Sequence, residues 1–200
     1  MPPLAPRFSY KHGLPIAGWL HEKVQRGVFG RCAVDRTSGE VRQVKHPNPI
    51  LDSVDTFLRG ERKFTKRGTT WYLKHRELTW VFNLQKSQYG GAHYLNVAIW
   101  LNLIDESEWP PEHKCHIRAR LGSLADPEDE LAIERAFNLD ESIDEPTRRG
   151  SVLMYLNDVL GPVLENVHSV EDLNGGVGRE YLRRSLVRGS AQKLLSDRAT

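Results

Sequence analysis

Two neighbouring segments decide the fold: Leu78-Thr-Trp-Val-Phe-Asn-Leu-Gln-Lys-Ser87 and Tyr94-Leu-Asn-Val-Ala-Ile-Trp-Leu-Asn102. Successive residues of a β-strand point to opposite faces of a sheet, so an apolar residue at every second position indicates one buried face. Both segments show this alternation, with Leu78, Trp80, Phe82 and Leu84 in the first and Leu95, Val97, Ile99 and Leu101 in the second. The pattern is typical of an antiparallel sheet that packs one face on a core.

The alternation extends in both directions, from Trp71 to Leu121. Trp71 and Leu73 begin it, and a later segment alternates Cys115, Ile117, Ala119 and Leu121 with His116, Arg118 and Arg120. The sequence therefore predicts an α+β fold in which a four-stranded antiparallel meander sheet has helices packed on one face.

Turn positions suggest how these strands pair. The predicted pairs are Trp71 with Trp80, Asn83 with Asn96, Gln85 with Tyr94, and Trp100 with Arg118. The first pair assumes a two-residue turn at His75-Arg76. A neighbouring register of the central hairpin, shifted by two residues, keeps the same faces. The last pair would place a guanidinium on an indole, which is a cation–π contact.

The second face of this sheet is polar in an unusual way. It carries amides, arginines and aromatic rings, and the candidate ligand-binding residues are Asn83, Gln85, Ser87, Tyr94, Asn96, Trp100, His116, Arg118 and Arg120. Such side chains offer directional donors and acceptors. Two interpretations stand side by side: the face binds a ligand, or a loop or terminal helix covers it and the amides satisfy the backbone of that cover.

The 200-residue length suits one domain with an appendage. We divide the chain into an N-terminal extension (1–47: arm, short helix and hairpin), a main α+β domain (48–172) and a C-terminal helix (173–200). Helices are predicted from Pro49 to Gly60, from Asp126-Pro127 to about Phe137, and from Val152 to Val167 with a kink at Gly161-Pro162.

Composition restricts the cellular setting and the partners. The net charge is only +2, but the first half is basic and residues 101–150 are acidic, which indicates internal complementarity at least as much as a nucleic-acid surface. Cys32 and Cys115 lack a spacing motif and fit a reducing compartment. The sequence contains no apolar run of membrane-spanning length and no signal peptide, so we expect a soluble, cytoplasmic protein without membrane contact.

Motifs for chemistry are weak. Gly175-Gly-Val-Gly178 lacks the remainder of a phosphate-binding motif, and His113-Lys-Cys-His116 would point its ligands to opposite faces of a strand. No carboxylate is placed beside His116 to complete a catalytic set. The sequence therefore predicts no cofactor and no metal site, and it assigns no catalytic residue.

Four segments carry a resemblance to a known family: Arg67-Gly-Thr-Thr-Trp-Tyr72, Val81-Phe-Asn-Leu-Gln-Lys-Ser87, Tyr94-Leu-Asn-Val-Ala-Ile99 and Cys115-His-Ile-Arg-Ala-Arg-Leu121. They resemble the bacterial domain-of-unknown-function family 4304, over roughly residues 50–170. The resemblance implies an antiparallel sheet flanked by helices and a cytoplasmic bacterial protein, and it implies no activity.

The leading hypothesis is a non-enzymatic binding module that grips a protein partner or a nucleotide-like ligand with the polar sheet face, as an immunity or defence-associated protein would. One alternative is an enzyme acting on nucleic acid or nucleotides, with His116 as general base and Arg118 as charge stabiliser. Another is a nucleic-acid-binding protein that uses the basic first half and the last helix. Ligand identity, oligomeric state and the role of residues 1–47 stay open.

Overall fold

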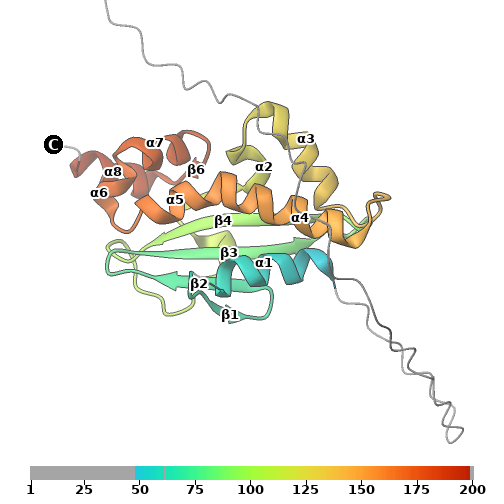
Figure 1. The fold of residues 1–200 in the computed structure, drawn as a ribbon. Helices are drawn as coiled ribbons and strands as arrows, with labels where there is room; N and C mark the ends of the chain where they lie inside the picture. Colours follow the sequence, from blue (N-terminus) through green and yellow to red (C-terminus); the bar gives the residue numbers. More distant parts are fainter. Residues whose placement is uncertain (1–47, 61, 199–200) are drawn as a thin grey trace, which may run out of the picture. The chain divides into compact units, whose positions relative to one another are not determined.

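A computed structural model describes residues 48–60 and 62–198. The predicted N-terminal extension (1–47) lies outside the described residues. The described part contains a six-stranded antiparallel sheet in the order β1-β2-β3-β4-β5-β6 (Figure 1). Its strands are β1 (Thr65–Arg67), β2 (Thr70–Lys74), β3 (Leu78–Lys86), β4 (His93–Leu101), β5 (Ile117–Arg120) and β6 (Leu186–Val187).

The predicted α+β class and antiparallel meander are confirmed, but the prediction of four strands is wrong. The two additional strands are the short edges of the sheet. β1 lies in a basic segment and turns back through Gly68 at φ 60°, and its three residues carry no apolar alternation. β6 interrupts the predicted C-terminal helix, because the outer edge of β5 takes Leu186 and Val187 as pairing partners.

Helices α1, α4 and α5 lie over one face of the sheet (Figure 1). The predicted first helix is confirmed as α1 (Pro49–Arg59), since the side-chain oxygen of Asn48 accepts the amides of Ile50 and Leu51, and Gly60 ends it. The predicted long helix is α4 (Glu145–Tyr155) and α5 (Gly161–Asn166), joined by the π-helical segment η2 (Leu156–Leu160). Pro162 has no amide hydrogen, which explains why the regular hydrogen-bond ladder widens just before it.

Shorter helices surround the sheet ends. They are η1 (Glu112–Lys114), α2 (Leu121–Leu124), α3 (Pro127–Ala136), α6 (Val170–Leu173), α7 (Gly176–Arg183) and α8 (Gly189–Asp197). The predicted helix from Pro127 is confirmed as α3. No helix of the described residues combines the length and the apolar character that crossing a membrane requires.

The main core lies between the first sheet face and the helices. It includes Trp71, Trp80, Phe82 and Ile99, all without solvent exposure. Trp80 donates its indole N–H to the carbonyl of Val167 at 3.1 Å, which fixes the chain just beyond α5 against the sheet. The C-terminal helices contribute Tyr181, Ala191 and Leu195 to the same core.

The register predictions have mixed outcomes. Asn83 pairs with Asn96 and Gln85 with Tyr94, as predicted. Trp71 instead pairs with Phe82, and Arg118 with Ala98, so these two predictions are wrong by two residues. A shift of two keeps the paired strand residues on their predicted faces, while the individual neighbours change.

Candidate functional site

The second sheet face is divided into a covered half and an open half. The loop between β4 and β5, residues 102–116, lies over the first half and carries Trp109. The covered half-face comprises the candidate residues Trp100, His116 and Arg118. The open half-face comprises the remaining candidate residues, of which Asn96 is buried at 6% exposure: Asn83, Gln85, Ser87, Tyr94, Asn96 and Arg120.

A second apolar cluster lies under the β4–β5 loop. It contains Tyr72, Val81, Ala98, Trp100 and Cys115, with Trp109 packed against it. The rings of Trp109 and Tyr72 meet edge to face at 5.1 Å between centroids. Tyr72, Val81, Ala98 and Trp100 lie on the face that was expected to be polar, whereas Cys115 was predicted to point into the core, and that prediction is wrong.

Trp109 also lies under two cations. The guanidinium of Arg67 is 4.2 Å from the centroid of its ring, and the ammonium of Lys74 is 4.3 Å from it. Such cation–π contacts contribute about 0.5–1 kcal/mol each at exposed sites. Trp109 therefore helps to hold the loop on the sheet through contacts with three neighbours.

Trp100 and His116 are internal partners of the fold. Trp100 is only 6% exposed, and its indole N–H donates to the carbonyl of Asp105 at 2.8 Å. His116 lies directly beside it, with ring centroids 4.5 Å apart, where the sequence predicted Arg118. The Nδ1 atom of His116 accepts the amide of Leu101 at 3.1 Å, and burial lowers the pKa of this imidazole.

Arg118 is neutralised within the chain. Its Nε and Nη2 atoms donate to the two carboxylate oxygens of Glu112 at 2.8 and 3.2 Å. The Glu112 side chain is 11% exposed and that of Arg118 is 31% exposed. This two-point contact attaches the end of the β4–β5 loop to β5 and occupies the guanidinium that the sequence assigned to a ligand.

Cys115 is buried under the same loop. Burial raises the pKa of its thiol to about 12, with the Glu112 carboxylate adding to the effect. A thiol in this state has almost no reactive thiolate at neutral pH. Among the described residues no group of three or more histidine, cysteine, aspartate or glutamate side chains is arranged to hold a metal ion.

The open half-face keeps unused hydrogen-bonding capacity. Asn83 donates its amide to the hydroxyl of Thr70 at 2.9 Å, and Asn96 donates to the side-chain oxygen of Gln85 at 3.2 Å. The Asn83 oxygen and the Gln85 nitrogen have no partner among the described residues. The Ser87 hydroxyl accepts the amide of Tyr89 at 3.2 Å.

Arg120 is the exposed cation of the open half-face. It stands diagonally across from Tyr94 on the neighbouring strand, and its guanidinium is 4.6 Å from the centroid of the tyrosine ring. Within residues 48–60 and 62–198 it forms no ion pair. Tyr94 and Arg120 thus present a flat ring and a free guanidinium together.

A cavity of about 330 Å³ adjoins the open half-face, between the ends of β4 and β5 and the helices α2 and α3. Figure 1 shows α2 and α3 side by side at this edge. The lining combines Tyr94 and Arg120 with apolar Ile133 and with Glu130 and Glu134 of α3. Neither acid was among the site residues predicted from the sequence. Their spacing from Ile133 and Phe137 shows that they share a helix face with apolar residues. The sequence does not show which part of the fold this helix face packs against.

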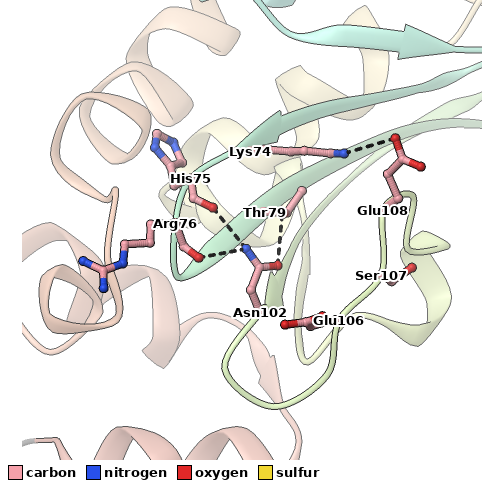
Figure 2. A pocket seen from close by; sticks show the side chains of 8 residues that line it. All are labelled: Lys74, His75, Arg76, Thr79, Asn102, Glu106, Ser107 and Glu108. Atoms are coloured by element: carbon pink, nitrogen blue, oxygen red, sulfur yellow. Dashed lines mark hydrogen bonds and ion pairs between the residues drawn. The ribbon is translucent and has the colours of Figure 1, made fainter.

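A second, more open pocket of about 500 Å³ lies at the opposite end of the sheet (Figure 2). Asn102 is at its centre: it accepts the Thr79 hydroxyl and donates to the carbonyls of His75 and Arg76. Lys74 pairs with Glu108 across it at 3.8 Å. Asn102, Thr79, Lys74 and Glu108 thus satisfy one another, whereas the buried Nε2 of His75 in the same lining has no hydrogen-bond partner among the described residues.

The basic residues that suggested nucleic-acid contact are largely paired. In the first basic segment, Lys66 lies 2.9 Å from a carboxylate oxygen of Asp55. In the last helices, Arg183 and Arg184 both bond to Glu180, and Arg184 also reaches Asp126 at 2.9 Å. Arg184 and Asp126 thus form a salt bridge between the basic tail and the acidic segment, in line with the internal complementarity that the charge distribution indicated.

A model for a family described as a domain of unknown function, DUF4304, matches residues 62–166. The matched range contains β1 to β5 and α2 to α5, including every residue of the open half-face. No curated protein and no solved structure matches the chain significantly. Because the family model covers more than half of the 200 residues, the chain belongs to the DUF4304 family.

Proposed function

We propose that this chain is a non-enzymatic binding module that recognises a partner protein through the open half-face. The observation that carries the proposal is Arg120, a guanidinium without an intramolecular carboxylate partner in the described residues, held on the ring of Tyr94 at 4.6 Å. An arginine supported in this way loses little conformational freedom when a partner carboxylate binds it.

A protein partner is favoured by the composition of the surface. Tyrosine and arginine are the residue types that most often dominate protein interfaces. Tyr89, at the tip of the β3–β4 hairpin, is 96% exposed and lies at the same end of the sheet as Tyr94. The unused oxygen of Asn83 and nitrogen of Gln85 add directional contacts. An immunity or defence-associated role, in which one protein captures another, fits such a module.

The geometry gives less support to the enzyme hypothesis. Its proposed base, His116, uses Nδ1 to accept a backbone amide, and its proposed charge stabiliser, Arg118, is bound to Glu112. A general base needs a free nitrogen close to a substrate proton. The remaining exposed groups of the open half-face are amides, a hydroxyl, a phenol and a guanidinium, which suit recognition.

The experiment is quantitative affinity capture from the native host lysate with three proteins: the wild-type chain, Arg120→Glu and Arg76→Glu. Arg76 is an exposed arginine at the opposite end of the sheet, so its reversal changes net charge equally without touching the open half-face. A captured protein that meets the proposal is retained by Arg76→Glu and reduced at least about tenfold by Arg120→Glu. Equal capture by both variants would refute the proposal.

A further inference from the structure

The cavity beside the open half-face has rims of opposite charge and an apolar floor. Arg120 stands on the β5 side, and Glu130 and Glu134 stand on the α3 side. Between them the floor is formed by Leu95, Ile133 and Phe137, which are at most 5% exposed. The charged groups and the apolar surface therefore meet in one partly open cavity.

The charges at the two rims are unpaired. Within the described residues Glu130 and Glu134 take part in no ion pair, although they follow each other at the helical spacing of four residues. Two carboxylates at this spacing repel each other, which costs a few tenths of a kcal/mol in an isolated helix. Arg120 is held by the Tyr94 ring and does not cross the cavity to neutralise them.

We propose that this cavity binds a small zwitterion with an apolar body, such as a free amino acid with a large apolar side chain or a short peptide of such residues. Arg120 receives its carboxylate through paired N–H donors. Glu130 and Glu134 receive its ammonium group, and Leu95, Ile133 and Phe137 cover its side chain. A volume of about 330 Å³ lies at the small end of the range of ligand cavities, which suits a molecule of this size.

The other charged and titratable groups at this cavity do not compete for such a ligand. His93 lines it, but its Nδ1 donates to the carbonyl of Gly91 at 2.8 Å and its Nε2 accepts the side-chain amide of Asn48 at 3.1 Å. His93 therefore links the start of α1 to β4 through a hydrogen bond with Asn48. The recognition falls to the arginine and the two glutamates.

The test is isothermal titration calorimetry of the full chain with L-phenylalanine, L-leucine and L-leucyl-L-leucine. The matched probes are N-acetyl-L-phenylalanine, which lacks the ammonium, and L-phenylalanine amide, which lacks the carboxylate. We expect at least one zwitterion to bind at least about tenfold more tightly than its singly blocked analogues. Arg120→Gln should abolish the preference for the free carboxylate, and Glu134→Gln should weaken the preference for the free ammonium.

Two control variants separate the site from general charge effects. Glu128→Gln removes a carboxylate from the first turn of α3 outside the cavity lining, and Arg76→Gln removes an exposed arginine at the other end of the sheet. Both should bind as the wild type does. Circular dichroism on each variant confirms that the fold is retained.

Three results would overturn the proposal: no saturable binding of any of the three zwitterions at millimolar concentration, binding unchanged in the Arg120→Gln/Glu134→Gln double variant, or dependence on only one of the two charges. The proposal shares Arg120 with the proposed function but goes beyond it. Glu134→Gln keeps the two distinguishable, because it should lower zwitterion affinity and leave the capture of a partner protein intact.

Discussion

Replacing Trp109 by alanine should release the β4–β5 loop from the covered half-face. The lost contacts are the edge-to-face packing on Tyr72 and the two cation–π contacts with Arg67 and Lys74. An aromatic pair contributes about 0.5–1.5 kcal/mol and each partly exposed cation–π contact about 0.5–1 kcal/mol. We therefore expect the free energy of unfolding to fall by about 2–3 kcal/mol.

The same change should expose Cys115, which has no solvent exposure under the loop. In a Cys32→Ser background, a thiol reagent at pH 8 reports on Cys115 alone. The buried thiol has its pKa raised to about 12, so it reacts only through local opening. A loss of about 2 kcal/mol from the closed state accelerates the reaction roughly 30-fold.

Trp109→Phe is the matched control, since it keeps an aromatic ring at the same place and should retain most of the protection. Stability is measured by urea unfolding followed by circular dichroism, because fluorescence would change with the number of tryptophans. If Trp109→Ala unfolds within about 0.5 kcal/mol of the wild type and Cys115 stays protected, this ring does not hold the loop on the sheet.

Three further predictions follow from the internal contacts. A double-mutant cycle of Glu112→Gln and Arg118→Met should give a coupling of about 1 kcal/mol in urea unfolding, because the contact is two-point and partly buried; a coupling near zero would make it an ordinary surface pair. Burial lowers the pKa of His116 below its ordinary value, so its contribution to stability is complete above about pH 6.5 and is lost as the pH falls through the lowered pKa. His116→Gln should therefore flatten the slope of unfolding free energy against pH in that acidic range. An unchanged slope would contradict the burial of this imidazole. Arg148 is 3% exposed and donates four hydrogen bonds to backbone carbonyls at and beyond the end of α3. Arg148→Met should therefore lower the free energy of unfolding by about 3 kcal/mol, which corresponds to a drop of roughly 6–12 °C in Tm. An unchanged Tm would show that those carbonyls find other hydrogen-bond donors.

Features encoded by neighbouring residues were predictable from the sequence. The start of α1 follows from Asn48 and Pro49, which act within one helical turn of each other. The assignment of faces follows from the period of two along each strand, and within the strands it holds even where the register is wrong. It fails at Cys115, which precedes β5. The central hairpin has the first of the two registers that the alternation allows, because a shift by two residues would keep the same faces.

Features that depend on distant residues were not predictable. The two wrong registers involve connections whose lengths the sequence does not fix: Lys74 pairs with Thr79, not with Glu77. β6 forms because the backbone of Leu186 and Val187 pairs with the outer edge of β5, which is distant in sequence. A strand of two residues is too short to show a periodicity in the sequence. Of the candidate site, the face was predicted, and cover by a loop was one of two interpretations. Which half the loop covers was not predicted, since nothing local links Trp109 to Tyr72.

The central claim is that recognition occurs on the open half-face, and amide hydrogen exchange of the chain alone and with a captured partner tests it most directly. We predict slower exchange of the β3–β4 hairpin around Tyr89 and Tyr94 and of β5 near Arg120, with no change in the turn at Arg76. Protection centred on that turn, or on the helices that cover the first face, would contradict the claim.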